Sequence, residues 1–248
     1  MPAFKDHFSR QSAAYSRYRP GYPDALIEFV VASAPDTRLA IDCATGNGQA
    51  ALQLAPHLDL VLAVDGSEAQ VTKAPRHPRV RYAVATAERL PVAGGCASII
   101  VAAQAAHWFD FDRYYAECRR VLEPRGVIAV WTYELFRFDS ALDAMLHGFY
   151  ANEVGAYWPP ERRYVEEGYR ALPFPFVEEP SPAFELVTEW TLDDVLGYLG
   201  SWSAVQRYKD ARGQDPLVAF GSRLAAAWPP SQPVARLRWP IHLRLGRV

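Results

Sequence analysis

Two aspartates and a pair of glycines stand where two predicted strands end, with the spacing of a cofactor site. Asp42 closes the apolar run at 39–43, and Gly46 and Gly48 follow it in a turn. Asp65 closes a second apolar run about 20 residues beyond the first glycine, the position of a ribose-binding acid in open α/β sheets. Because glycine tolerates positive φ values and lets the backbone approach a ligand closely, the pattern predicts a nucleotide-type cofactor at the carboxyl ends of the strands.

The glycine-rich turn by itself leaves two kinds of cofactor open. Residues 46–51 also fit the pattern Gly-x-Gly-x-x-Gly/Ala, which is typical of NAD-dependent dehydrogenases. Both interpretations give Asp65 the same role on the ribose. No Tyr-x-x-x-Lys pair for hydride transfer is evident downstream.

The wider order of motifs favours one family. After the turn and Asp65 come Ala87-Glu88-x-Leu90-Pro91, then the run at 104–109, then Arg120-Val121-Leu122-Glu123-Pro124-x-Gly126. Over most of the chain this order resembles the class I S-adenosylmethionine-dependent methyltransferases. The segments at 8–23, 107–109 and 239–244 resemble the small-molecule branch that includes trans-aconitate methyltransferase-like proteins.

The resemblance implies S-adenosyl-L-methionine as cofactor and assigns a set of residues to it. Asp65 would accept both ribose hydroxyls through its two carboxylate oxygens, although an acid here could instead cap a helix. Glu88 could read the adenine or belong to an ordinary loop, and Ala44 stands where the family usually has glycine. The expected cofactor-binding residues are Arg19, Asp42, Ala44, Gly46, Gly48, Asp65, Gly66, Ala87, Glu88, Gln104 and Trp108.

The run at 104–109 follows the fourth predicted strand and, in related enzymes, faces the transferable methyl group. Aromatic faces attract a sulfonium cation, and His107 is the candidate catalytic residue because an imidazole can take a proton from a nucleophile or orient it. Alternatively, His107 caps the next helix and the neighbouring aromatics pack against it. The expected substrate-binding residues are Tyr18, His107, Trp158 and Trp202.

These residues need a parallel sheet to position them. Strands are predicted near 39–43, 60–64, 79–85, 97–103 and 127–132, alternating with helices near 48–55, 67–74 and 111–122. Such alternation favours a parallel sheet covered on both faces. The resemblance adds an antiparallel C-terminal strand at 239–248, so we expect a Rossmann-like, seven-stranded, mostly parallel sheet with a helical substrate cap.

We expect one methyltransferase domain, 1–248, because the chain carries enough apolar residues for one large core. Residues 1–23 are expected to form a lid over the cofactor. The regular alternation stops after Trp131, and an irregular, aromatic and proline-rich region runs to 182. The insertions at 133–182 and 191–230 are expected to form the substrate cap.

Composition excludes several classes of partner. The net charge of −2 comes from interspersed acids and bases, which gives no footprint for nucleic acid or an anionic membrane. The three scattered cysteines suit reduced thiols in the cytoplasm, and no apolar run reaches membrane-spanning length. The six histidines lack metal-ligand spacing. We therefore expect a cytoplasmic protein, monomeric or homodimeric, that acts on a small molecule and holds no metal.

The expected reaction is methyl transfer to a small organic acceptor, more at oxygen than at nitrogen or carbon. A carboxylate acceptor is one hypothesis, since two of Arg137, Arg162, Arg163, Arg207 and Lys209 could clamp it, as guanidinium matches carboxylate in a two-pronged fork. Those cations could equally form a solvated surface among acids. A non-catalytic cofactor-binding protein with the same fold stays open as an alternative.

Overall fold

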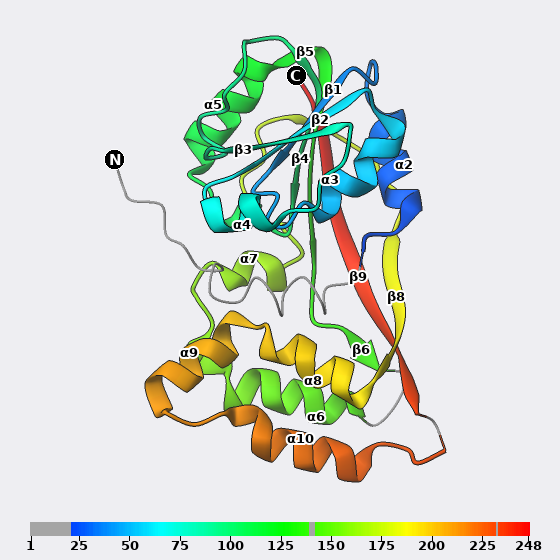
Figure 1. The fold of residues 1–248 in the computed structure, drawn as a ribbon, viewed down its shortest axis with the longest axis vertical. Coiled ribbons are helices and arrows are strands. Elements are labelled where there is room, and N and C mark those ends of the chain that lie inside the picture. The colour runs from blue at the N-terminus through cyan, green and yellow to red at the C-terminus, as the bar shows by residue number, and fades with distance from the viewer. Residues whose placement is uncertain (1–20, 139–141, 232) are drawn as a thin grey trace.

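The computed structural model describes residues 21–138, 142–231 and 233–248. An upper part consists of a sheet with helices on both faces, and a lower part consists of helices (Figure 1). Two long strands, β8 and β9, run from one part to the other. The expected lid over 1–23, with Tyr18 and Arg19, lies almost wholly outside the described residues.

The sheet confirms the predicted fold class. Its parallel core has the order β3-β2-β1-β4-β5, and β9 then pairs antiparallel with β5, followed by β6. Two further strands, β7 and β8, also pair with β9. The bounds are β1 Leu39–Cys43, β2 Leu60–Asp65, β3 Val80–Val84, β4 Ala97–Ala103, β5 Leu122–Tyr133, β6 Arg137–Phe138, β7 Val177–Glu179, β8 Phe184–Thr191 and β9 Val234–Arg247.

Two strands begin earlier than the sequence predicts. β5 starts at Leu122 rather than near 127, and β9 starts at Val234 rather than near 239. The segment around Pro124 and Gly126 lies ahead of the predicted start of β5, and proline and glycine commonly interrupt regular structure. In the structure it forms an irregular strand start: Arg125 has a φ of 69° and the β4–β5 register shifts between Ala97 and Ile99.

Helices of the upper part follow the predicted alternation. They are α2 (Asp24–Ala32), α3 (Gln49–Leu54), α4 (Glu68–Lys73) and α5 (Phe111–Val121), with short 3-10 turns η2 (Ala55–His57) and η3 (Ala106–Trp108). Side-chain oxygens of Ser67 and Asp110 accept backbone N–H groups at the starts of α4 and α5, which satisfies donors that a helix N-terminus leaves free.

The lower part is more regular than the sequence predicts for 133–182. Along the chain the elements are α6 (Leu142–Gly148), the π-helical turn η4 (Phe149–Glu153), η5 (Gly155–Tyr157), α7 (Arg162–Glu166), which lies between the two parts, and then α8 (Leu192–Gly200), α9 (Ser203–Arg212) and α10 (Pro216–Ala227). The first four are too short to produce a helical hydrophobic period, and prolines precede α7, so local pattern could not identify them.

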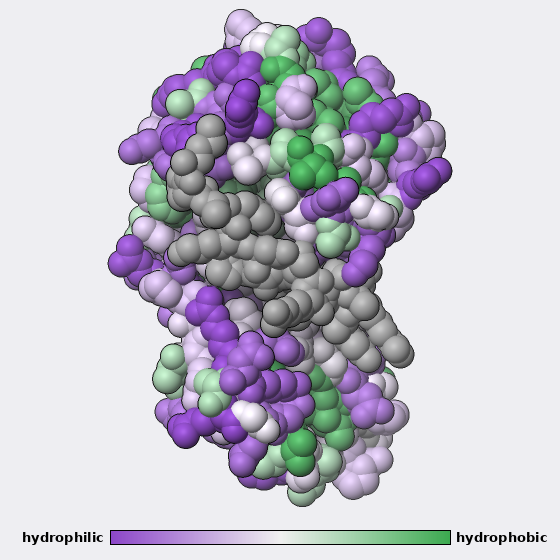
Figure 2. Space-filling view, turned by 60° about the vertical axis from the view of Figure 1, so that its left-hand side comes forward, coloured by the Kyte–Doolittle hydropathy of each residue, from purple (hydrophilic) through white to green (hydrophobic). Residues whose placement is uncertain are grey.

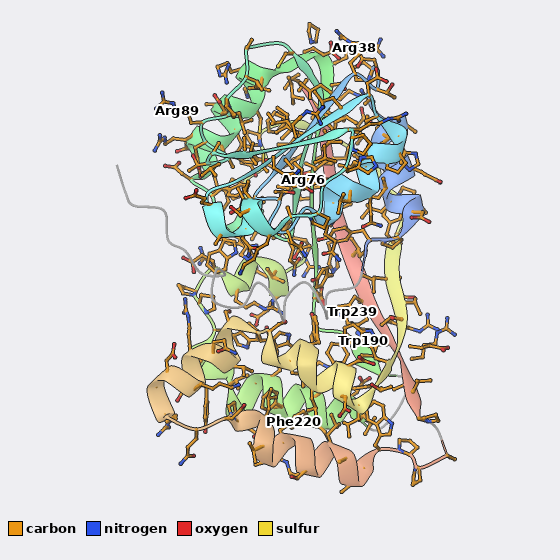
Figure 3. All side chains as sticks on the ribbon, viewed as in Figure 1. Arg38, Arg76, Arg89, Trp190, Phe220 and Trp239 are labelled. Atoms are coloured by element: carbon orange, nitrogen blue, oxygen red, sulfur yellow. The ribbon has the colours of Figure 1, made fainter. Side chains whose placement is uncertain are left out.

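Aromatic rings join the sheet to the lower helices. The rings of Trp190 on β8 and Trp239 on β9 meet edge to face, 5.2 Å apart, and Figure 3 shows the two together above α8. Tyr198 of α8 packs against both. Deeper in the helices, Phe220 stacks on Phe149 at 4.3 Å. β9 thus contacts both parts, because it pairs with β5 in the sheet and packs Trp239 against Tyr198 of α8.

On the face that Figure 2 shows, hydrophobic residues reach the surface only in separate patches among hydrophilic ones. None of the helices in the described part of the chain has the length and apolar character needed to cross a membrane.

Candidate functional site

Asp42 lies at the end of β1, where the strand order of the sheet changes direction. The chain passes from β1 outward through β2 and β3, then returns to place β4 on the other side of β1. Ligands of open α/β sheets bind outside the carboxyl ends of the strands at such a point. The structure therefore puts the predicted carboxylate at the position in the sheet where a cofactor is expected.

The Asp42 carboxylate is completely buried. Its Oδ2 accepts hydrogen bonds from Thr45 Oγ1 at 2.5 Å and from the Ala51 amide at 3.1 Å. Its Oδ1 has no hydrogen-bond partner among the described residues. Burial raises the pKa of Asp42 to about 7. A buried acceptor without a donor is costly, which is consistent with a ligand completing this site.

Asp65 ties the turn to the second strand. Its Oδ2 accepts the Gly46 amide and its Oδ1 accepts the Ser67 amide, both at 2.8 Å. The helix-cap alternative is wrong for Asp65, because Ser67 is the N-cap of α4 and accepts the Gln70 amide. Asp65 thus fixes the turn and the segment after β2 to each other at the carboxyl edge of the sheet.

The backbone of residues 44–48, which we term the turn, has three positive φ angles. Ala44, Gly46 and Gly48 have φ of 54°, 57° and 87°. A Cβ on Gly48 would collide with the hydroxyl of Tyr82, whereas a Cβ on Gly46 would meet no atom within 4 Å. Gly46 thus borders open space, where the backbone of the turn is accessible to a ligand.

The remaining cofactor candidates lie after neighbouring strands. Gly66 directly follows β2, and Ala87 is buried in the loop after β3. Glu88 Oε1 accepts the Asp110 amide at 3.1 Å and so links that loop to the start of α5. All three lie near the carboxyl edge of the sheet, as a bound nucleoside requires.

Gln104 fastens the end of β4 to β5. Its Oε1 accepts Thr132 Oγ1 at 2.6 Å and the Tyr133 amide at 2.9 Å, and its Nε2 donates to the Tyr133 carbonyl at 3.1 Å. Its backbone adopts a φ of 56°. The side chain thereby holds in place the loop that carries the predicted substrate residues.

A cleft with aromatic walls opens beside this loop, and we term it the aromatic cleft. It unites the loop after β4, the end of β5 and both predicted cap insertions. Its lining residues are Gln104, His107, Trp108, Tyr133, Glu134, Leu135, Trp158, Pro159, Arg162, Tyr198, Trp202 and Ser203. The structure therefore brings together His107, Trp158 and Trp202, three of the four predicted substrate residues, whereas the residues of the turn do not line this cleft.

His107 is buried and neutral. Its Nδ1 lies 2.8 Å from the hydroxyl of Tyr169, and burial together with the charge of Arg162 lowers the pKa of His107 to about 3. Burial raises the pKa of Tyr169, so its hydroxyl keeps its proton. An imidazole with so low a pKa is a poor base at neutral pH, and the geometry suits orientation of an acceptor better than proton removal.

Arg162 is the cation of the aromatic cleft. Its Nε donates to the Tyr150 hydroxyl at 2.8 Å, and its guanidinium carbon lies 4.5 Å from the centre of the Trp158 ring. No carboxylate in the described ranges lies within ion-pair distance of it. The expected two-cation clamp is absent from this lining: Lys209 pairs with Asp215, and the remaining candidates, Arg137, Arg163 and Arg207, do not line the cleft.

Sequence reasoning missed Glu134 and Tyr169. Glu134 lines the aromatic cleft just beyond β5, and its Oε1 lies 2.6 Å from His242 Nε2. An acid directly after a predicted strand is the signal that singled out Asp42 and Asp65, and it could have identified Glu134 as well. Tyr169 gives no local signal, because its partner His107 is distant in the chain. Within the described part of the chain, no three His, Cys, Asp or Glu side chains group as a metal site would require.

Comparison with known proteins agrees with this geometry. A family described as "Methyltransferase domain" matches residues 41–130. A solved structure from Anaeromyxobacter dehalogenans, provisionally named a type II methyltransferase, shares 46% identity over 93% of this chain and 98% of that chain, with a TM-score of 0.86.

Two curated relatives extend the comparison. A protein of Dictyostelium discoideum, provisionally named a methyltransferase, is 29% identical over 98% of this chain and 95% of its own. A Saccharomyces cerevisiae protein provisionally named an S-adenosylmethionine-dependent methyltransferase is 25% identical over 64% of this chain and 59% of its own. The comparisons favour neither an NAD-dependent dehydrogenase nor a non-catalytic binder. This chain belongs to the class I methyltransferases and uses S-adenosyl-L-methionine as its cofactor.

Proposed function

We propose that this enzyme methylates an oxygen of a small carboxylate acceptor bound in the aromatic cleft. One observation carries the proposal. Arg162 lines the cleft, half-buried between ring faces, without a carboxylate partner in the described ranges. Of the other acid-base groups that line the cleft, His107 is neutral, and Glu134 lies beside His242 rather than within ion-pair distance of Arg162.

A carboxylate acceptor matches the chemistry of the cleft. The cofactor supplies a methyl group on a positively charged sulfur: a carboxylate oxygen forms the new O–CH₃ bond as the S–CH₃ bond breaks, leaving an ester and a neutral thioether. The acceptor is already ionised near neutral pH, so the reaction requires no base. The low pKa of His107 is therefore no obstacle, and its ring would orient the acceptor.

The chain's own residues would divide the task in two. The turn, with Asp42, Gly46, Gly48 and Asp65, would hold the cofactor beyond β1 and β2. The insertions at 133–182 and 191–230 would act as a cap, since Trp158 of the first and Trp202 of the second both line the cleft. Closure between them would exclude water and align the reacting atoms.

The test is turnover of matched acceptor panels with S-adenosylmethionine: small carboxylates against phenols and amines. We expect methyl esters as products, and an Arg162→Gln variant should raise the KM for carboxylates about tenfold or more, because one charge-assisted pair is lost. Arg163→Gln is the matched control, since Arg163 is exposed over Tyr164 and does not line the cleft. Activity on phenols or amines alone would refute the proposal.

A further inference from the structure

Glu134 lines the aromatic cleft just beyond β5. Its Oε1 lies 2.6 Å from His242 Nε2, and both side chains are about one-third exposed or less, 27% and 31%. Its Oε2 has no partner in the part of the chain that the structure describes. Because Glu134 lines the cleft, this second oxygen can accept a hydrogen bond from a bound molecule.

His242 lies beside that carboxylate. His242 is opposite Thr132 in the β5–β9 register, so Glu134, two residues farther along, is its diagonal neighbour. The imidazole ring is packed against Gly168, where an added Cβ would lie 2.8 Å from the ring. Two residues along β9, Arg244 donates to the Tyr169 carbonyl at 3.1 Å.

The same contacts connect Glu134 to His107. Arg244 and His242 fix the segment that carries Tyr169, and the Tyr169 hydroxyl contacts His107. The lining of the cleft therefore includes three groups that differ in charge and hydrogen-bonding character: a guanidinium at Arg162, a neutral imidazole at His107 and an acceptor-only carboxylate at Glu134. Such fixed polar groups in an apolar site determine which ligands fit.

We propose that Glu134 is a specificity-determining residue, and that the acceptor carries a single carboxylate together with a hydrogen-bond donor, such as a hydroxyl group. This inference rests on the proposed function, in which Arg162 binds the carboxylate. Glu134 would accept the donor group of the ligand. A second carboxylate at that place would face an acceptor-only group of like charge and leave both without a donor, so the cleft would reject polycarboxylates.

The test uses three acids that share one aromatic skeleton and differ only opposite the carboxylate. Cinnamate has hydrogen at that position, 4-hydroxycinnamate has a hydroxyl, and 4-carboxycinnamate has a second carboxylate. Dissociation constants are measured by calorimetry on the full chain saturated with S-adenosylhomocysteine. We expect 4-hydroxycinnamate to bind about 10- to 100-fold more tightly than 4-carboxycinnamate, with cinnamate between them, as a hydrogen bond to a charged group predicts.

Two variants test whether Glu134 causes the difference in affinity between the acids. Glu134→Gln keeps the size of the side chain but adds an amide donor, so it should weaken 4-hydroxycinnamate, strengthen 4-carboxycinnamate and reduce the ratio to within about threefold of unity. Glu185→Gln is the control, because Glu185 also forms an ion pair, with Arg238, but does not line the cleft. Unchanged S-adenosylhomocysteine binding verifies that each variant is folded.

The outcomes separate this inference from the proposed function. If all three acids bind with equal affinity, or if Glu134→Gln leaves their ratio unchanged, the role of Glu134 is refuted while the carboxylate proposal stands. If none of the three acids binds to the saturated enzyme although other small carboxylates are methylated, the role of Glu134 is refuted; if small carboxylates are not methylated either, both proposals are refuted. If the ratio collapses in Glu134→Gln but not in Glu185→Gln, the assignment is supported.

Discussion

Asp42 should cost the protein stability at neutral pH, and replacing it with asparagine should recover that stability. The pKa of Asp42 is raised from 3.8 to about 7 by burial. Between these values the unfolded chain loses the proton and the folded chain keeps it. The stabilisation is thus fully present below pH 3.8 and is lost as the pH rises to 7. At about 1.4 kcal/mol per pKa unit, the loss reaches about 4 kcal/mol.

The assay is urea unfolding of the wild type and Asp42→Asn across pH 4 to 8. The variant's carbonyl oxygen can accept from Thr45 and Ala51, and its amide is uncharged at every pH. We expect similar stabilities near pH 4 and an advantage for the variant that grows to about 4 kcal/mol by pH 8. Parallel pH profiles would refute the reasoning, because they would mean that Asp42 ionises freely in the folded protein.

The Asp42→Asn variant also tests whether the Asp42 carboxylate binds the cofactor. If Asp42 accepts the ammonium of the cofactor, binding lowers its pKa and releases part of a proton near pH 7. Calorimetric titration of S-adenosylhomocysteine should then give different heats in phosphate and Tris buffers, and Asp42→Asn should abolish the difference and weaken binding. Equal heats in both buffers for the wild type would contradict this role.

Three further changes should have distinct effects. Gly48→Ala should lower the free energy of unfolding by about 2–4 kcal/mol in urea, because the new Cβ meets a φ of 87° and collides with the Tyr82 hydroxyl. Adding Tyr82→Phe to this variant should restore only part of the loss, because the φ angle is unchanged. His107→Gln should make the free energy of unfolding depend less on pH in acid. In the wild type, the pKa of His107 is lowered to about 3 in the folded state, so its contribution is fully present above pH 6.5 and is lost by about 1.4 kcal/mol per pH unit as the pH falls toward 3. Arg162→Lys should raise the KM for carboxylates about tenfold and leave S-adenosylhomocysteine affinity unchanged, since lysine keeps the charge but loses the stacking on Trp158.

The sequence predicts the sheet and the turn well because their signals are local. Buried parallel strands such as Ala97–Ala103 appear as continuous apolar runs, and the acid and glycines of the turn lie within seven positions of one another. Periodicity and turn chemistry report on such neighbours directly. The positive φ angles at Gly46 and Gly48 are predicted from the glycines themselves, because glycine tolerates this conformation.

The aromatic cleft depends on contacts between distant segments, which no local pattern encodes. Trp158 and Trp202 were named as substrate residues, but Tyr198 and Glu134 were not, although all four line the same cleft. Likewise, the sequence offers five cations for an anionic ligand, and only the fold shows that Arg162 is the one in the cleft. Short helices without a hydrophobic period, such as α7, decide that placement.

The most direct test of cofactor use is calorimetric binding of S-adenosylhomocysteine, compared with NAD⁺, to the wild type and to Asp65→Asn. The wild type should bind S-adenosylhomocysteine and not NAD⁺. The variant should bind it at least about tenfold more weakly, because an amide cannot accept both ribose hydroxyls. NAD⁺ binding without S-adenosylhomocysteine binding, or equal affinity of the variant and the wild type for S-adenosylhomocysteine, would contradict the assignment of the turn as the cofactor site.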